Sequence, residues 1–214
     1  MTIIEPSLKV CGFCKSKIEV FDLFSSSQYD CSDLDSRPAK PYRSTMNSWV
    51  TRCIDCGFCS NDITSFSQQN IGLIKSESYQ NQLNDSLFGE LANSFLCHSM
   101  ILKHEKRVRE AALSTLCAAW CCDDSKDYQA AIECRKKVDV LLSSIAQTLE
   151  HNSYDHLLHV DVLRRANQFD RAIERYEQVI NQVTDISLNN LLKFERELSY
   201  QGDNQSYKVD MKLH

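Results

Sequence analysis

The sequence has little glycine and little proline, with 5 and 3 residues among 214. So few turn-forming residues argue against a turn-rich β-sandwich and predict long uninterrupted elements. The sequence also lacks any apolar run near the roughly 18 residues that a membrane-spanning helix needs. Its first residues lack the basic stretch and apolar core of a signal peptide. We therefore expect a soluble, cytoplasmic protein with no membrane partner.

Basic residues are fewer than acidic ones: the sequence has 24 Lys and Arg and 29 Asp and Glu, which gives a formal net charge of −5. This balance disfavours nucleic acid as a partner, since phosphates attract basic surfaces. Residues 1–75 hold eight charges of each sign, so the acidic excess lies in the remainder. The sequence contains no nucleophile elbow, phosphate-binding loop or helical His-Glu-x-x-His motif. We expect no enzymatic activity.

Cysteine, in contrast, is abundant, with 11 residues. In a reducing compartment, cysteines are more often ligands or core residues than disulfide halves, and an odd number fits a closed set of bridges poorly. Six of them lie in residues 1–75, together with all three prolines. This region has too few large apolar residues for a core of its own. A region this small, with so few apolar residues, usually needs a disulfide or a bound metal ion to be stable.

The strongest motif is a pair of Cys-x-x-Cys turns, formed by Cys11 with Cys14 and by Cys53 with Cys56. Each turn brings two thiolates within about 2.3 Å of one ion, and two turns complete a tetrahedron. Four thiolates leave no open coordination position, so these residues predict a structural Zn²⁺ site rather than a catalytic one. Gly57 follows the second turn, at a position that often needs a positive φ.

Other cysteine chemistry remains open. Cys59 extends the spacing of the second turn as in an iron–sulfur protein, although the further Cys-Pro of the ferredoxin pattern is missing. Cys31 lies between the two turns as a spare ligand or a packed residue. A thioredoxin-type pair needs a helix directly after the motif, whereas Cys14 precedes a predicted strand at 18–21. The later cysteines form either a second thiolate site or, as we favour, part of the packed core; they are Cys97, Cys117, Cys121, Cys122 and Cys134.

Short strands are predicted at 18–21 and 48–51, flanking the cysteines. From about residue 84 the pattern becomes helical, and the apolar residues between Leu87 and Leu102 share one face. We expect six helices, the first opening after Asn84-Asp85 and the others at about 107–122, 127–149, 153–166, 168–183 and 185–199. The polar tail, residues 201–214, is expected to fray.

Two of these helices begin alike: residues 127–133 and 168–174 each have an aromatic residue followed by Ala-Ile-Glu, with Ala131 and Ala172 equivalent. The pattern resembles the second helix of a tetratricopeptide repeat. Tyr176 matches the later aromatic position of that repeat, whereas Arg135 departs from it. The spacing of the copies exceeds the family period of about 34 residues and implies an insertion. An ordinary antiparallel helical bundle is the alternative.

The cysteine region also resembles an uncharacterised bacterial family with two Cys-Pro-x-Cys turns, an acidic segment and a Tyr between them, and tetratricopeptide-like helices afterwards. The matching segments are Cys11-Gly-Phe-Cys14, Asp33-Leu-Asp35, Tyr42 and Cys53-Ile-Asp-Cys56-Gly-Phe58. Both turns lack the family's Pro, and Cys59 stands where a small residue is usual. The resemblance implies zinc binding and helical repeats, and it implies no reaction.

Taken together, these patterns predict an α+β protein that is mainly α. A zinc-ribbon-like head with short β-strands covers residues 1–75, a tetratricopeptide-like antiparallel helical array covers 84–200, and the tail covers 201–214. The expected function is protein–protein interaction or scaffolding, with a protein or peptide held in the groove of the array. A nucleic-acid-binding zinc ribbon and a thiol redox or iron–sulfur protein are the alternatives.

Overall fold

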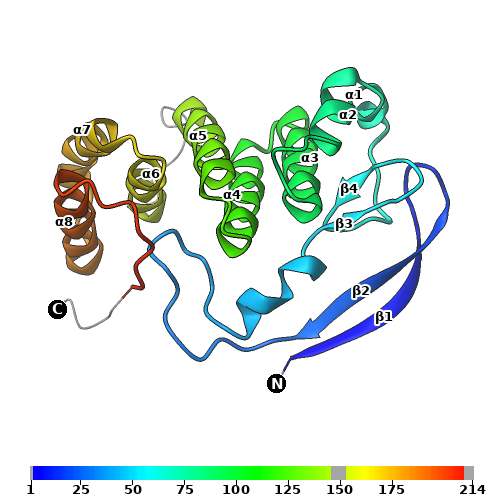
Figure 1. The fold of residues 1–214 in the computed structure, drawn as a ribbon, viewed down its shortest axis with the longest axis horizontal. Coiled ribbons are helices and arrows are strands. Elements are labelled where there is room, and N and C mark those ends of the chain that lie inside the picture. Colours follow the sequence, from blue (N-terminus) through cyan, green and yellow to red (C-terminus); the bar gives the residue numbers. More distant parts are fainter. Residues whose placement is uncertain (1, 146–152, 210–214) are drawn as a thin grey trace.

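The structure is a computed structural model that describes residues 2–145 and 153–209. The chain folds as an α+β protein that is mainly α, as predicted. Figure 1 shows a row of helices along one side of the molecule, with the N-terminal strands and a long loop along the other. Among the described residues, no helix is both long and apolar enough to cross a membrane.

Two antiparallel hairpins make up the strands of the N-terminal region. The strands are β1 (Ile3–Val10), β2 (Lys17–Ser25), β3 (Thr51–Arg52) and β4 (Cys59–Ser60), paired β1 with β2 and β3 with β4. The first hairpin buries one face through Ile18 and Val20, which are 6% and 5% exposed. The strand predicted at 18–21 is therefore confirmed as part of β2.

The strand predicted at 48–51 is wrong over most of its length. A 3-10 helix, Tyr42–Ser48, includes the first residue of this range, and β3 begins only at Thr51. Thr45 explains the difference, because its hydroxyl donates to the carbonyl of Tyr42 and accepts from the indole N–H of Trp49, each at 2.9 Å. Such local side-chain hydrogen bonds compete with strand formation.

The helical part begins earlier than its apolar periodicity indicates. Its helices are α1 (Ile71–Ile74), α2 (Glu77–Leu83), α3 (Glu90–His104), α4 (Val108–Asp124), α5 (Tyr128–Ile145), α6 (Ser153–Arg165), α7 (Phe169–Val179) and α8 (Ile186–Tyr200), with short 3-10 turns at Gln68–Asn70 and Ile180–Gln182. The six predicted helices correspond to α3–α8. Residues 146–149, where the third was expected to end, lie outside the described residues.

Helices α1 and α2 were not predicted, and Asn84 ends α2 instead of opening α3. The N-terminal signal of α2 is Ser76, whose hydroxyl accepts from the backbone N–H of Tyr79. This is an ordinary serine cap. The following helix, α3, begins later than expected, after an extended Gly89.

Three connections between helices share one geometry. The chain turns through positive φ angles of 64°, 62° and 60° at Lys106, Lys126 and Asn167. Five residues further on stands an alanine that is at most 1% exposed; these alanines are Ala111, Ala131 and Ala172. A methyl group allows close approach of the paired helices. The two copies of Ala-Ile-Glu thus belong to a set of three connections, and the sequence hides the third because Val108 replaces the aromatic residue.

The head shares its hydrophobic core with the helices. One cluster of buried side chains runs from Cys11, Ile18 and Phe58 into α2–α5, and a second joins Leu34 to α6–α8. The helices therefore supply the apolar surface that residues 1–75 lack. Figure 1 shows the loop after β2 passing beneath α4, α5 and α6.

The described part of the C-terminal tail is paired and does not fray as expected. The backbone N–H of Leu34 donates to the carbonyl of Tyr207, and that of Val209 donates to the carbonyl of Ser32, each at 2.8 Å. Asp33 and Lys208 form an antiparallel bridge between these contacts. The tail thus holds the loop after β2 against the helices.

A buried ion network fastens the same loop to α4, α5 and α6. The carboxylate of Asp35, which is 0% exposed, accepts from the indole N–H of Trp120 at 2.8 Å and pairs with Arg165 at 2.5 Å. Arg135 lies 3.7 Å away and also binds Asp123 at 2.6 Å. Burial alone would raise the pKa of Asp35, but the charges of Arg165 and Arg135 outweigh it and lower the pKa.

A second buried cluster lies between α6 and α8. There Arg164 pairs with two carboxylates, Asp161 at 2.9 Å and Glu195 at 2.5 Å. Glu195 is 0% exposed. Burial, followed by the charge of Asp161, raises the pKa of Glu195 well above its usual value. This carboxyl therefore favours the folded state when protonated, and its contribution is lost as the pH rises from about 4.3 through the raised pKa.

We expect Glu195→Gln to be at least as stable as the wild type at pH 9, with an advantage that grows as the pH rises. The amide resembles the protonated acid and leaves Arg164 paired with Asp161. Urea unfolding at pH 5, 7 and 9 measures the difference. The control is Glu197→Gln on the exposed face of α8, where no such trend is expected. The assignment is contradicted if the stability of Glu195→Gln relative to the wild type falls between pH 5 and pH 9.

Candidate metal centre

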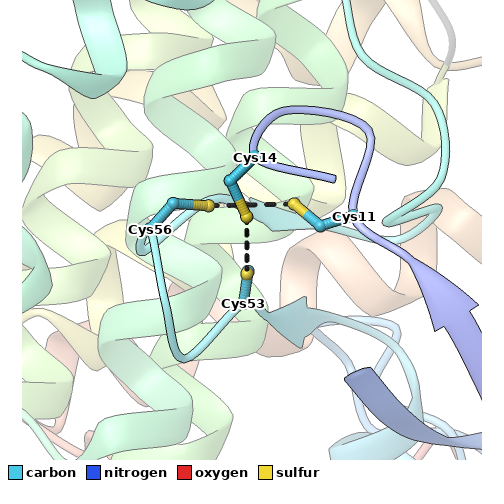
Figure 2. Close-up of side chains that lie close together, drawn as sticks. All are labelled: Cys11, Cys14, Cys53 and Cys56. Carbon is cyan, nitrogen blue, oxygen red and sulfur yellow. Dashed lines mark hydrogen bonds between the residues drawn. The ribbon is translucent and has the colours of Figure 1, made fainter. Parts of the chain in front are cut away.

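Each Cys-x-x-Cys motif forms the turn of a hairpin. The first cysteine turn, Cys11–Cys14, connects β1 to β2, and the second, Cys53–Cys56, connects β3 to β4. Figure 2 shows the four side chains pointing inward from the two turns toward a common centre. Pairing of the strands on either side therefore fixes the position of both turns.

The two turns have the same backbone hydrogen bonds. In the first, the N–H of Cys11 donates to Ser16 O at 2.8 Å, and the N–H of Lys15 donates to Cys11 O at 3.0 Å. In the second, Cys53 donates to Phe58 O and Gly57 donates to Cys53 O, each at 2.8 Å. Lys15 and Gly57 occupy equivalent positions with φ of 66° and 75°. The positive φ at Gly57 is the one that its position predicted.

The sulfur positions fit a four-thiolate site. All four Sγ atoms lie within 4.8 Å of one another. The Sγ atoms of Cys11 and Cys56 are 3.7 Å apart, and those of Cys14 and Cys53 are 3.6 Å apart (Figure 2). A tetrahedron with metal–sulfur bonds of about 2.3 Å has sulfur–sulfur edges of about 3.8 Å. The spacing therefore suits a single tetrahedral ion with no room for a substrate among its ligands.

Burial and polarity differ among the four thiols. Cys11 and Cys53 are buried, whereas Cys14 is exposed. Burial raises the pKa of Cys11. At Cys14 a smaller burial effect is outweighed by hydrogen bonds from Ser16, and the pKa falls to about 6. A bound cation would deprotonate all four, because metal-coordinated thiols are thiolates.

The structure brings together the four predicted ligands and leaves the alternative cysteines outside. Among the described residues, no other group of three or more metal-ligating side chains lies as close together. Cys59 is buried in β4 and contacts the carbonyl of Gly57 through its thiol at 3.4 Å. Cys31 lies in the loop after β2, half-buried. The later cysteines pack in and around the helical core.

Several residues that support the centre carry little signal in the sequence. The ring centroid of Phe66 lies 5.0 Å from that of Phe13 and 5.4 Å from that of Phe58, so it packs between the two cysteine turns. Tyr79 of α2 donates its hydroxyl to Gly57 O at 3.0 Å. The sequence could have indicated one supporting feature: aligning the two cysteine turns places Lys15-Ser16 opposite Gly57-Phe58.

Gly57→Ala is expected to destabilise the second cysteine turn. A positive φ costs an L-residue about 1–2 kcal/mol. The added Cβ would also lie 2.4 Å from Cδ2 of Leu83. Urea unfolding and chelator competition measure the losses of stability and of metal affinity.

The matched control is Gly72→Ala in α1, where a Cβ meets no atom within 4 Å. In a helix this exchange is expected to be neutral or to stabilise by up to about 1 kcal/mol. Equal stability and metal affinity for Gly57→Ala and the wild type contradict the assigned role of Gly57.

No family model matches this chain, and neither a curated protein nor a solved structure matches it. The resemblance to the bacterial family with two Cys-Pro-x-Cys turns therefore stays a prediction.

Proposed function

We propose that the chain is a non-enzymatic, zinc-stabilised interaction protein of the cytoplasm. In this proposal a Zn(Cys)4 centre holds the head on a tetratricopeptide-like helical array, and the array binds a protein or peptide. The observation that carries the zinc assignment is the tetrahedral sulfur spacing on two equivalent turns. Thiolates favour zinc among the common divalent ions, and a closed four-thiolate site is structural. All 11 cysteines are free thiols, which suits a reducing compartment.

Two features of the structure bear on where we expect a peptide to bind. The loop after β2 already covers part of the array, since Leu34 and Asp35 are 2% and 0% exposed against α4–α8. A cavity of about 590 Å³ remains between α5 and the C-terminal tail. Apolar atoms of Tyr128, Ala131 and Ile132 line it from α5.

The remainder of this cavity is polar. Its other lining residues are Asp123, Arg135, Arg165, Asn167, Asn204, Gln205 and Ser206. The arginines are already paired with Asp35 and Asp123, so the cavity offers amide and hydroxyl groups rather than a free positive charge. Amides both donate and accept, as a polypeptide backbone does, while the α5 residues offer apolar contact to a side chain. We therefore propose this cavity as the peptide site.

Affinity capture with the zinc-loaded full chain tests the site. Ile132→Lys and Tyr128→Lys add charge to its apolar side and should abolish capture of a specific partner. Ile186→Lys on α8, where Ile186 is 78% exposed, should not. If wild type and all variants recover the same proteins, or no specific protein, the proposed peptide site is wrong. If capture depends on added RNA or DNA and falls steeply with salt, the nucleic-acid alternative replaces it.

A further inference from the structure

Outside the metal centre, the structure brings cysteines together in two buried pairs. Cys59 of β4 meets Cys97 of α3, and Cys122 of α4 meets Cys134 of α5. All four residues are at most 2% exposed. Within each pair, the interaction between the two thiols shifts their pKa values in opposite directions, downward for Cys59 and Cys122 and upward for Cys97 and Cys134. None of these contacts was evident from the spacing of the cysteines.

The surroundings of the Cys122–Cys134 pair differ from those of the other pair. Cys122 lines a cavity of about 420 Å³ between the end of α4, the start of α3 and the 3-10 helix. Cys134 is 0% exposed and does not line this cavity. Cys59 is enclosed: it is 0% exposed, and its backbone N–H donates to the hydroxyl of Tyr79 at 3.2 Å. A small solute therefore has a route to Cys122.

We propose that Cys122 and Cys134 form an oxidation site, at which a peroxide that enters this cavity converts the two thiols into an intrachain disulfide. The Cys122 thiol releases its proton, the thiolate attacks one peroxide oxygen, and the O–O bond breaks. The leaving hydroxide takes up a proton, so the products are a sulfenic acid and water. The Cys134 sulfur then attacks the Cys122 sulfur, the S–O bond breaks, and a second water leaves. The two thiols are oxidised by two electrons and one peroxide is reduced to two waters.

The roles of the two thiols follow from their environments. Cys122 lines the cavity whereas Cys134 does not, so an entering peroxide meets Cys122 first. The hydrogen bond from Cys134 also lowers the pKa of Cys122. Cys121 also lines the cavity and is more exposed, but burial raises its pKa. Burial likewise raises the pKa of Cys117 to about 12. The raised pKa makes both thiols less reactive toward peroxide than Cys122.

Peptide mapping of the zinc-loaded full chain after brief treatment with hydrogen peroxide tests the site. Tryptic cleavage after Lys126 separates Cys122 from Cys134, so a bridge links two peptides that are otherwise free. Alkylation before digestion marks the thiols that have not reacted. We expect the Cys122–Cys134 bridge to form at least about tenfold faster than a Cys59–Cys97 bridge, since Cys122 lines a cavity whereas Cys59 is enclosed.

Two single variants sharpen the test. In Cys134→Ser the sulfenic acid has no resolving thiol, and dimedone should label Cys122. Cys97→Ser, the matched change in the enclosed pair, should leave the Cys122–Cys134 bridge unaffected. The proposal is overturned if Cys122 and Cys134 remain alkylatable after peroxide while Cys121 or Cys117 is oxidised. It is also overturned if both buried pairs oxidise at the same rate. The wild-type map decides both points even if a variant does not fold.

Discussion

Replacing Cys53 by serine is expected to abolish metal binding and to unfold the N-terminal hairpins. Cys53 is 0% exposed, and its sulfur lies 3.6 Å from that of Cys14. Losing one of four thiolates removes most of a binding energy on the order of 10 kcal/mol, which is also folding energy because the site exists only in the folded chain. Far-ultraviolet circular dichroism, limited proteolysis and metal analysis measure the change.

The loss of structure in Cys53→Ser is expected to extend from the hairpins to the helices. Cys11, Cys53 and Phe58 belong to the same buried cluster as the apolar faces of α2 and α3. Cleavage by a protease should therefore begin in residues 1–60 and extend to α2. Cys31→Ser is the matched control, because Cys31 lies between the same two turns but outside the sulfur cluster. If Cys53→Ser keeps both its metal and its resistance to proteolysis, the four cysteines are not a metal site.

The second large effect is expected for Asp35→Ala. This carboxylate is fully buried between Trp120, Arg135 and Arg165. Removing one partner of a buried ion network leaves uncompensated charge and typically costs about 3–5 kcal/mol. Urea unfolding of the metal-loaded protein measures the loss, and Asp35→Asn separates loss of the charge from loss of the side-chain volume.

The matched control is Asp30→Ala in the same loop, where the carboxylate is exposed and pairs with Lys208 on the surface. No measurable loss is expected there, since exposed ion pairs contribute little. The depressed pKa of Asp35 adds a dependence on pH: its contribution is complete above about pH 4 and falls as the pH drops through the lowered pKa. The unfolding free energies of wild type and Asp35→Ala should therefore converge in acid. A constant difference across that range contradicts the role given to Asp35.

The predictable features were those fixed by local spacing. Two Cys-x-x-Cys turns must each present both sulfurs on one side, and helices with a continuous apolar face must bury it. For this reason the cysteine set and the helices α3–α8 could be foreseen. Even the positive φ of Gly57 followed from its position directly after a cysteine turn.

Features that depend on contacts between distant residues could not be foreseen. Asp35 belongs to an acidic stretch that on sequence alone suggests an exposed loop, and only the meeting of three helices makes it a buried anchor. The tail is equally polar, yet it pairs with Ser32 and Leu34 from the opposite end of the chain. Likewise, no spacing rule connects Cys59 with Cys97. The shared core of head and helices arises from such distant contacts, so the head does not need to supply a core alone.

Elemental analysis of the purified full chain, together with its visible absorption spectrum, tests the central claim most directly. We predict one zinc ion per chain and a colourless protein, with zinc lost in Cys53→Ser and kept in Cys31→Ser. An iron-containing coloured protein, or a metal-free protein whose Cys11, Cys14, Cys53 and Cys56 are linked as disulfides, would contradict it.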